Sequence, residues 1–359
     1  MDAFIRSVQE RILAAHSSKS PVVIHAGNTK SFYGAKSTGE AIDVRGYAGV
    51  IDYQPRELVL TVRAGTPLAE IESLMDQEGQ ILPFEPPHFS AGATIGGTVA
   101  AGLSGPRRAY AGAVRDFVLG TRIINGKGED LRFGGRVIKN VAGYDVSRLM
   151  VGALGTLGVL LDLSFKVLPK PASEVTLRFE MDESSAIRRL NEWAGQPLPL
   201  SASWWLDGVA VVRLSGTNAG VAAAKQKLGG EQVSHTEAAE VWRSVRDHQH
   251  PFFQTAEQTS TPLWRLSVPA TTSMLALGSK QLHEWGGALR WLAADVDADA
   301  LRAKIAAVGG HATLMYKRGS MARAFHPLEG KLAELNRNLK VAFDPANVLN
   351  RGRLDNVLI

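Results

Sequence analysis

Hydrophobic positions in the first 170 residues follow helical spacing in two places and strand spacing in several others. Apolar residues recur every three to four positions between residues 3 and 15, which predicts a helix with one buried face. A second helix is predicted over residues 66–79, where Thr66 can cap the first turn. An Asn-Gly pair at 125–126 lies between two apolar runs, as in a β-hairpin. The predicted strands cover residues 21–28, 41–53, 58–65, 117–133 and 157–169.

The pattern changes near residues 168–173, and beyond them short strands alternate with helices. This alternation predicts helices packed on one face of an antiparallel sheet, in a domain separate from the first. All seven tryptophans lie between Trp193 and Trp291, so the second domain holds the bulkiest apolar side chains. The expected strands cover 175–181, 209–216, 262–269, 287–295 and 312–317, and the expected helices begin at Glu183 and Ala219 or lie near Met274 and Leu301. A last helix over 326–343 leads into the tail.

Composition narrows the class of protein. The chain has 359 residues, 45% of them hydrophobic and 21% charged, which suits two folded domains. The net charge of +5 comes without a dense run of Lys and Arg, so we expect no nucleic-acid partner. There is no cysteine, which excludes disulfides, thiolate metal sites and iron–sulfur ligation by this chain. The longest apolar run is 13 residues, too short to span a bilayer, and no signal peptide is evident, so we expect a cytoplasmic protein.

The first candidate site is the segment His25–Gly34, "HAGNTKSFYG", directly after a predicted strand. Successive backbone N–H groups in such a turn form a concave anion site, and Asn28, Thr29 and Ser31 add neutral donors. These groups suit a pyrophosphate. An ordinary strand-to-loop turn explains the same residues.

The second candidate is "SAGATIGGTVAAGLSG", residues 90–105, in which only Ile95, Val99 and Leu103 are not Gly, Ala, Ser or Thr. Thr94 can cap a helix that begins at Ile95 and places two glycines in its first turn, where N-terminal amides attract phosphate. Small side chains also let a flat ring approach the backbone. Close packing between helices requires small residues too, and the density of them here favours a ligand.

The third candidate is the segment 134–159, in which Lys139 or Arg148 can meet phosphate and Asp145 can cap or pair. Neither G-x-G-x-x-G after a strand nor G-x-x-x-x-G-K-[ST] occurs, and residues 152–158 read G-x-x-G-x-x-G. Any nucleotide is therefore bound without either of these two nucleotide-binding motifs.

Five segments in the same order resemble the FAD-binding domain shared by vanillyl-alcohol oxidase and p-cresol methylhydroxylase. They are "PVVIHAGNTKSFYG", "ATIGGTVAAGLSG", "YAGAVRDFVLGTRIINGKGEDLRFGG", "KNVAGYDVSRLMVGALGTLGV" and "FDPANVLNRGR". The resemblance covers about residues 5–170 and the tail. Within that superfamily, the small second domain and the wording "KNVAGYD" are most similar to the FAD-binding E subunits of bacterial glycolate oxidases.

The resemblance implies an α+β fold: a two-part FAD-binding domain of the p-cresol methylhydroxylase type and a cap domain with an antiparallel sheet and helices. The implied boundaries are 1–170 for the FAD-binding domain, 171–325 for the cap domain, and 326–359 for a C-terminal helix and tail that return to the first. The implied cofactor contacts are Ala26, Gly27, Asn28, Thr29, Lys30 and Ser31 around the pyrophosphate; Thr94, Ile95, Gly96, Gly97, Thr98, Ala101, Ser104 and Gly105 along the flavin and phosphates; Asp116; Val159, near adenine; and Asn350, on the flavin side.

Two features of the sequence bear on these implied contacts. The family tail reads N-P-G, whereas this chain has Asn350-Arg351-Gly352. A covalent flavin link through cysteine is impossible here, and His25 and His88 are the histidines at which a link is conceivable.

Oxidation of a 2-hydroxy acid needs a cation for the carboxylate, a base for the hydroxyl proton and a flavin to accept hydride. Arg265, on a predicted strand of the second domain, is the first candidate for the cation, followed by Arg323 and His326. Ordinary surface ion pairs explain each of them as well, and no base stands out. We expect no metal site. His311 lies where related dehydrogenases carry a metal motif, but the motif is missing, and His248 and His250 face apart if they lie on a helix.

Three functions are consistent with the sequence. The resemblance favours the FAD-binding subunit of a glycolate oxidase complex, which works with a sister flavin subunit and an iron–sulfur subunit, in the cytoplasm or at the inner membrane face through those partners. The second is a self-sufficient FAD enzyme for another small hydroxy acid or alcohol. The third is a non-catalytic assembly subunit that keeps a flavin fold.

Overall fold

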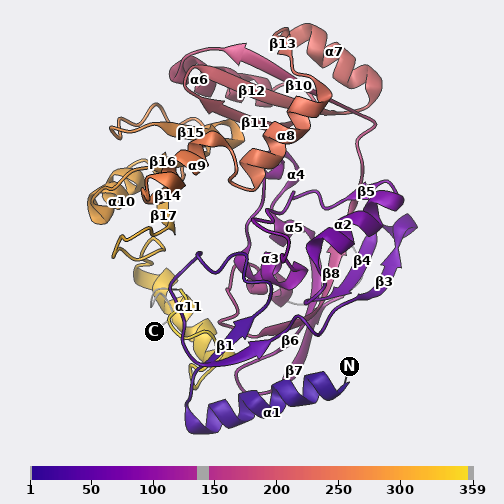
Figure 1. Ribbon diagram of the computed structural model, residues 1–359, viewed down its shortest axis with the longest axis vertical. Coiled ribbons are helices and arrows are strands. Elements are labelled where there is room, and N and C mark those ends of the chain that lie inside the picture. Colours follow the sequence, from indigo (N-terminus) through magenta and orange to yellow (C-terminus); the bar gives the residue numbers. More distant parts are fainter. Residues whose placement is uncertain (1, 136–144, 355–359) are drawn as a thin grey trace. The chain divides into compact units, whose positions relative to one another are not determined.

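The computed structural model describes residues 2–135 and 145–354, which form two compact units (Figure 1). The first unit comprises the described residues of 1–103, 113–169 and 327–359. The second comprises 104–112 and 170–326. Both mix helices with antiparallel sheets, as the sequence predicted. Residues 104–112, which the sequence analysis assigned to the FAD-binding domain, belong to the second unit because they pack against its sheet.

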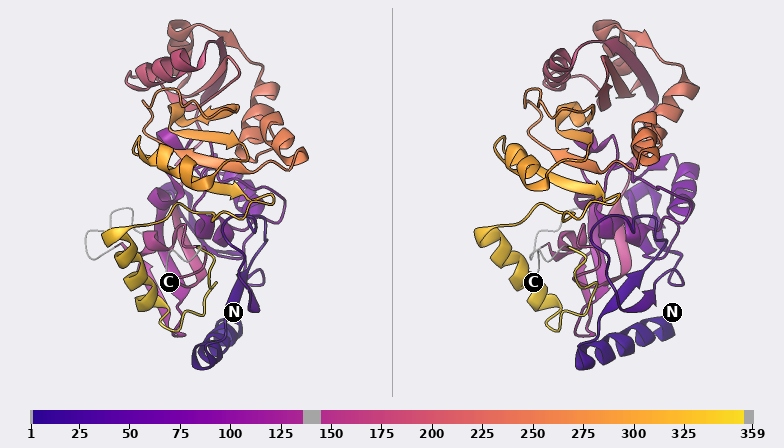
Figure 2. Two further views of the ribbon diagram at one scale, coloured as in Figure 1. Left: turned by 90° about the vertical axis from the view of Figure 1, so that its left-hand side faces the viewer. Right: turned by 60° about the vertical axis from the view of Figure 1, so that its left-hand side comes forward.

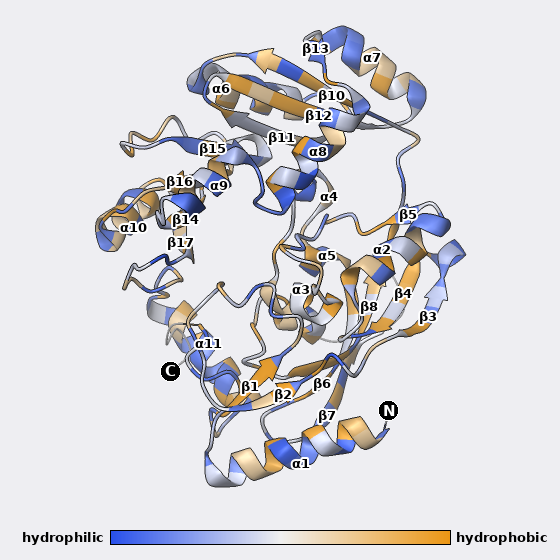
Figure 3. Cartoon of the chain, viewed as in Figure 1, coloured by the Kyte–Doolittle hydropathy of each residue, from blue (hydrophilic) through white to orange (hydrophobic). Residues whose placement is uncertain are grey.

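A five-stranded antiparallel sheet forms the centre of the first unit, in the order β3-β4-β8-β6-β7. Its central strands β4, β8 and β6 are largely hydrophobic (Figure 3). Strands β6 and β7 form the hairpin predicted at the Asn-Gly pair, with Ile124 opposite Asp130. The strands are β3 (Val50–Gln54), β4 (Val59–Arg63), β6 (Val118–Ile124), β7 (Asp130–Gly134) and β8 (Val159–Lys166).

Short helices pack against this sheet and form a hydrophobic core with it. Helix α2 contributes Leu68, Ile71 and Met75, all fully buried, to the cluster that contains Ile95 and Val99 of α3. Thr66 does not cap α2, because its hydroxyl instead donates to Arg63 O and accepts from Gly49 N. The elements are α2 (Leu68–Gln77), α3 (Ile95–Ala101), α5 (Val114–Phe117), the 3-10 turns η1 (Pro55–Glu57) and η2 (Val146–Met150), and the strand pair β5 (Gln80–Ile81) and β9 (Leu168–Pro169).

The N-terminal and C-terminal segments of the chain meet in the first unit. Helix α1 (Asp2–Ser18) buries its predicted face with Ile124 and Val159. Strand β1 (Val22–His25) pairs with β2 (Glu40–Asp43) in parallel and also meets the tail at Leu349. Helix α11 (Gly330–Phe343) lies beside the strands of this unit in both views of Figure 2. The tail thus joins the strand that precedes the first candidate site.

The second unit has an eight-stranded antiparallel sheet in the order β13-β10-β12-β11-β15-β16-β14-β17. One apolar cluster lies under α10 and contains Trp264, and another lies under α8 and contains Trp242. The strands are β10 (Ser173–Glu180), β11 (Leu200–Leu206), β12 (Val209–Gly216), β13 (Glu231–Gln232), β14 (Leu263–Ser267), β15 (Gln281–Glu284), β16 (Leu289–Ala293) and β17 (His311–Tyr316). The helices are α4 (Arg108–Ala111), α6 (Glu183–Ala194), α7 (Asn218–Leu228), α8 (His235–Arg246), α9 (Pro251–Gln258) and α10 (Ala298–Ala306), with the turn η3 (Trp285–Gly287).

The prediction of a helix near Met274 is wrong, because residues 273–277 form no regular element. The segment between β14 and β15 is irregular because its carbonyls bond side chains: Arg290 donates to Thr272 O and Ser273 O, and Gln281 donates to Leu275 O. The sequence analysis also missed β11, α8 and α9. Among the residues that the structure describes, no helix is both long enough and apolar enough to cross a membrane.

Candidate cofactor site

The loop Ala26–Ser31 follows β1 and presents free backbone donors. Within the described residues, the backbone N–H groups of Gly27, Asn28 and Thr29 have no acceptor. Asn28 has a φ of +55°, the left-handed conformation that turns successive N–H groups toward one side of a loop. This arrangement fits an anion, and the pyrophosphate contact stays a prediction from the sequence.

A second loop, around residues 85–93, packs against the Ala26–Ser31 loop. A Cβ on Gly27 would lie 1.5 Å from Gly92 O, so the two backbones touch only because residue 27 has no side chain. Phe32 packs edge-on against Phe89, with ring centroids 5.1 Å apart, and the Lys30 ammonium lies 5.4 Å from the Phe89 centroid. Gly27 thus serves the packing of the loop.

Helix α3 begins at Ile95 and Thr94 caps it, as predicted, with Gly97 N donating to Thr94 Oγ1 at 3.2 Å. The other first-turn donors are also engaged. Ile95 N donates to Thr66 O at 3.0 Å, and Gly96 N donates to Ala64 O at 2.8 Å. The amides expected to attract phosphate therefore already have protein acceptors, whereas three backbone donors of the Ala26–Ser31 loop have none among the described residues.

The glycines of residues 90–105 serve two purposes. A Cβ on Gly96 would lie 2.7 Å from Ala64 O, and one on Gly102 would lie 2.9 Å from Gly152 Cα, so both permit close packing of the protein itself. At Gly97 a Cβ would approach only Thr94 Oγ1, at 3.2 Å, in the part of the chain that the structure describes, which leaves that side of the backbone open. The next residue, Thr98, is fully buried, and its hydroxyl has no hydrogen-bond partner within the described residues. An open glycine beside an unsatisfied hydroxyl fits a flat polar ligand such as a flavin.

The structure gives several other predicted contacts a structural role. The carboxylate of Asp116 accepts from Ala113 N at 2.8 Å and so caps α5. Val159 is fully buried in the cluster under α1, and Ala101 is 5% exposed. Ser104 and Gly105 belong to the second unit, where Gly105 O accepts from the Trp285 indole at 3.2 Å.

The third predicted segment is described from Asp145 onward, and Lys139 lies outside the described residues. Arg148 pairs with Asp145 at 2.6 Å, so its guanidinium has a carboxylate partner. Downstream, Gly152 N donates to Val99 O and Leu154 N to Ala100 O, which fixes this loop against α3.

The two histidines considered for a flavin link have side-chain partners. His25 Nδ1 lies 3.3 Å from Asn28 Oδ1, and His88 Nε2 lies 3.0 Å from Glu72 Oε2. These contacts hold the His25 ring against its own loop and the His88 ring against α2.

Arg265 lies on β14, as predicted, between β16 and β17. Its guanidinium is 5.3 Å from the centroid of Trp285, and that of Arg108 is 4.5 Å from the same ring. Arg265 has no ion pair or hydrogen-bond acceptor for its side chain within the described residues, so its charge is available to an anion. Arg323 presents its carbonyl to Arg302, and His326 Nδ1 lies 3.5 Å from Ala312 N.

The described residues contain no group of three or more His, Asp or Glu that could hold a metal. His248 and His250 are not on a helix, contrary to the assumption made from the sequence. They lie in the link between α8 and α9, where His250 accepts from Phe252 N and caps α9. The His248 ring stacks on Phe253, with centroids 4.3 Å apart.

We predict that the second unit becomes less stable in acid because of His248. Burial lowers the pKa of His248 to about 3, although the Asp247 carboxylate opposes the shift. As the pH falls below about 6.5, the unfolded chain binds a proton that the folded unit does not, and stability falls by up to about 1.4 kcal/mol per pH unit until the pH nears the folded-state pKa. Asparagine suits the left-handed backbone at 248, where φ is +57°, and does not titrate.

Urea unfolding of wild type and His248→Asn at pH 7.5 and 5.5 measures this effect. Tryptophan fluorescence is the readout, because all seven tryptophans lie in the second unit. The free energy of unfolding should depend less on pH in the variant, and equal pH dependence would contradict the prediction.

Comparison with known proteins shows which protein families this chain resembles. A family described as an FAD binding domain matches residues 5–134. Glycolate oxidase subunit GlcE of Escherichia coli (strain K12) is 46% identical over 353 residues, which cover 98% of this chain and 97% of that protein. Glycolate oxidase subunit GlcD of Bacillus subtilis (strain 168) is 33% identical over 128 residues, 36% of this chain and 27% of that protein.

More distant relatives share part of the sequence or the fold. D-lactate dehydrogenase of Anaerostipes hadrus is 30% identical over 164 residues, 45% of this chain and 34% of that protein. A solved structure of alkyldihydroxyacetonephosphate synthase matches 96% of this chain and 75% of its own, with a TM-score of 0.62 and 15% identity, which shows a shared fold. The first unit therefore carries an FAD-binding domain. The chain belongs to the family of glycolate oxidase subunit GlcE.

Proposed function

We propose that this protein is the FAD-binding subunit of a glycolate oxidase complex and takes part in oxidising a small 2-hydroxy acid, glycolate, to glyoxylate. The observation that carries the proposal is the 46% identity to glycolate oxidase subunit GlcE over nearly the full length of both chains. Partial similarity to D-lactate dehydrogenase, which is named for another 2-hydroxy acid, supports the substrate class.

Specific residues of the first unit fit FAD. The free N–H groups of Gly27, Asn28 and Thr29 would hold the pyrophosphate, and Ala26, Lys30 and Ser31 complete the loop. The open backbone at Gly97 and the unsatisfied Thr98 hydroxyl would meet the flavin. When bound, FAD supplies the acceptor for the hydride that leaves the hydroxy acid.

Arg265 is the residue that we propose for binding the substrate carboxylate. Its guanidinium has no carboxylate partner among the described residues, and it lies on a strand paired on both sides, which fixes its backbone. Arg323 and His326 are weaker candidates. Both lie in the irregular link between β17 and α11 and not on a paired strand, and His326 Nδ1 also lies 3.5 Å from a backbone donor, Ala312 N. A planar guanidinium can bind a carboxylate through two parallel hydrogen bonds.

We predict that Arg265→Met lowers kcat/KM of the assembled complex for glycolate by about 10- to 150-fold, because a hydrogen bond to a charged group is worth about 1.5–3 kcal/mol. The absorption spectrum of bound FAD should not change. Arg178→Met, at an exposed arginine of the same sheet, is the matched control and should leave kcat/KM unchanged. An Arg265→Met complex with wild-type kcat/KM would show that the carboxylate binds elsewhere.

We also propose that electrons leave this subunit through protein partners, a sister flavin subunit and an iron–sulfur subunit. The chain has no cysteine, so it cannot ligate an iron–sulfur cluster through thiolates. A relative whose match covers 98% of this chain is named as a subunit, which supports an assembly of several chains. The two alternatives are a self-sufficient FAD enzyme and a non-catalytic assembly subunit.

One experiment separates the three functions. The chain is produced alone, its visible spectrum is recorded, and glycolate is added without oxygen, before and after addition of the partner subunits. We expect a yellow protein whose flavin is reduced only when the partners are present, because this chain offers Arg265 for the carboxylate but no base for the hydroxyl proton stands out in its sequence. Reduction of the isolated chain would favour the self-sufficient enzyme, and a colourless chain that stays colourless with added FAD would favour the assembly subunit.

A further inference from the structure

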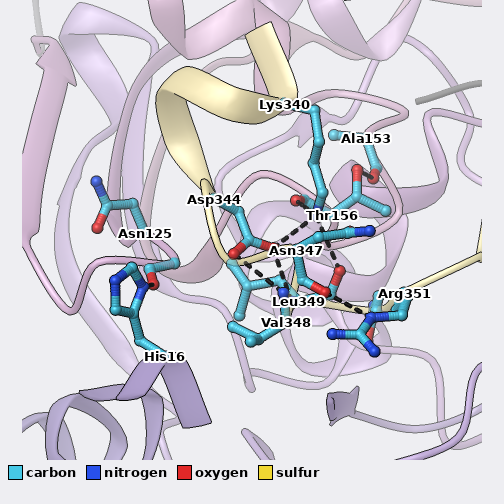
Figure 4. A network of polar contacts seen from close by, with 12 residues as sticks. His16, Asn125, Ala153, Thr156, Lys340, Asp344, Asn347, Val348, Leu349 and Arg351 are labelled. Carbon is cyan, nitrogen blue, oxygen red and sulfur yellow. Dashed lines mark hydrogen bonds and ion pairs between the residues drawn. The ribbon is translucent and has the colours of Figure 1, made fainter. Parts of the chain in front are cut away.

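A buried ion pair lies in the first unit, at the end of α11 (Figure 4). Lys340 is 4% exposed and Asp344 is 1% exposed. Lys340 Nζ donates to three oxygens: Asp344 Oδ2 at 2.6 Å, Thr156 O at 2.7 Å and Leu349 O at 3.2 Å. All three ammonium donors are therefore used, two of them on backbone carbonyls far apart in the sequence. Burial lowers the pKa of Lys340, and Asp344 opposes this shift.

Asp344 fixes the tail that follows α11. Its two carboxylate oxygens accept from Val348 N at 3.1 Å and Leu349 N at 2.8 Å. The hairpin loop of β6 and β7 packs against the same carboxylate, since a Cβ on Gly126 would lie 2.3 Å from Asp344 Oδ1. The pair is thus satisfied on both sides and holds one defined backbone path from Phe343 to Leu349.

This backbone path ends at Asn350, which joins two segments of the proposed FAD site. Asn350 Oδ1 accepts from Ile24 N at 2.8 Å, on the strand that enters the Ala26–Ser31 loop. Asn350 Nδ2 donates to Leu154 O at 2.6 Å. The loop 152–154 in turn donates to the carbonyls of Val99 and Ala100, on α3.

We propose that Lys340 is a positioning residue for FAD: its ion pair with Asp344 sets the relative placement of the Ala26–Ser31 loop and helix α3. The proposal rests on the proposed function, because it requires FAD at these two segments. Asn350 then acts through Ile24 and Leu154, and its own amide is used within the protein, which differs from the flavin contact implied by the family resemblance.

The energetics of buried charges support a positioning role over a purely stabilising one. Desolvating an ammonium and a carboxylate costs several kcal/mol, and well-packed apolar residues often stabilise a fold as well as the pair does. What apolar residues cannot do is hold the carbonyls of Thr156 and Leu349 by directed hydrogen bonds. The pair therefore specifies geometry at two backbones that lead to the cofactor segments.

The test compares FAD binding with the stability of the apo-protein. Lys340→Met leaves the Asp344 carboxylate buried and unpaired. This variant should therefore lower both the affinity for FAD and the stability of the apo-protein. The double variant Lys340→Met/Asp344→Leu removes both charges and should regain apo-protein stability, but its dissociation constant for FAD should stay about 10- to 100-fold above that of wild type, the size of effect known for residues that orient a binding site. Lys331→Met, at an exposed lysine on the same helix, is the control and should bind FAD as wild type does.

Titration of the full-length apo-protein with FAD gives the dissociation constant, and thermal unfolding followed by circular dichroism gives the stability. A double variant that is as stable as wild type and binds FAD equally well would overturn the proposal. If Lys340→Met does not fold, Asn350→Gly is the second variant. Glycine accepts the left-handed backbone at 350, where φ is +41°, and removes the side-chain contacts to Ile24 and Leu154. It should raise the dissociation constant by a similar factor, and wild-type affinity in that variant would also overturn the proposal. Failure of the wild-type chain to bind FAD would instead refute the proposed function, and with it the basis of this inference.

Discussion

Replacing Gly97 by leucine should abolish FAD retention while the second unit stays folded. A side chain at residue 97 would enter the open side of the backbone, where, among the described residues, a Cβ has only Thr94 Oγ1 within 4 Å. The protein itself therefore tolerates most of the added side-chain volume. A flavin bound in that space would clash with the leucine. We expect the purified variant to be colourless and to bind added FAD at least about 100-fold more weakly, a loss of roughly 2.7 kcal/mol or more.

The matched comparison is Gly96→Ala, one residue earlier on the same helix. Its Cβ would lie 2.7 Å from both Cβ and O of Ala64, so it should destabilise the apo form of the first unit. Tryptophan fluorescence monitors the second unit separately, because the first unit contains no tryptophan. Normal flavin content in Gly97→Leu would show that the cofactor does not approach this backbone.

Gly27→Ala should weaken FAD binding for a different reason. The new methyl group would lie 1.5 Å from Gly92 O, so the Ala26–Ser31 loop must move away from the loop around residues 85–93. Forced displacement of packed backbone costs about 1–3 kcal/mol, and the N–H groups of Asn28 and Thr29 would move with it. We expect the dissociation constant for FAD to rise by about 5- to 150-fold, measured by titration of the apo-protein.

Gly46→Ala is the control for this second prediction. Gly46 also lies in a turn of the first unit. No atom of residues 2–135 or 145–354 outside its chain neighbours would lie within 4 Å of a Cβ at this residue, so alanine is accommodated. Gly46→Ala should bind FAD with wild-type affinity. If Gly27→Ala binds FAD as tightly as Gly46→Ala, the pyrophosphate does not depend on this loop.

The two glycine predictions separate requirements that look the same in the sequence. Small residues at 27, 96 and 102 are needed where one backbone meets another, whereas residue 97 faces open space. A count of small residues cannot distinguish these cases, because packing and ligand binding both exclude side chains. The backbones that Gly27, Gly96 and Gly102 contact belong to Gly92, Ala64 and Gly152, respectively. Each partner is distant in the sequence from the glycine that it contacts.

The sequence by itself determined the elements whose pattern is local. Helix α1 has a clear apolar face, the Asn-Gly pair predicted the β6–β7 hairpin, and Thr94 caps α3 as its hydroxyl chemistry suggests. Five motifs in the family order also indicated the FAD-binding class of protein, since each motif is a short continuous segment of the chain. These features depend on neighbours within a few positions, which the sequence shows directly.

Only the tertiary structure decided which groups are available to bind. The first-turn amides of α3 are engaged by Thr66 and Ala64, so a helix start that suits phosphate in isolation has its donors occupied. The carbonyls of Thr272 and Ser273 bond Arg290 and that of Leu275 bonds Gln281, and the segment does not form the helix expected near Met274. Lys340 and Asp344 look like an ordinary exposed i, i+4 pair, yet the fold buries them and directs them at Thr156 and Leu349. Hydrogen-bond partners and burial are set by segments far apart in the chain, and for that reason no local pattern reveals them.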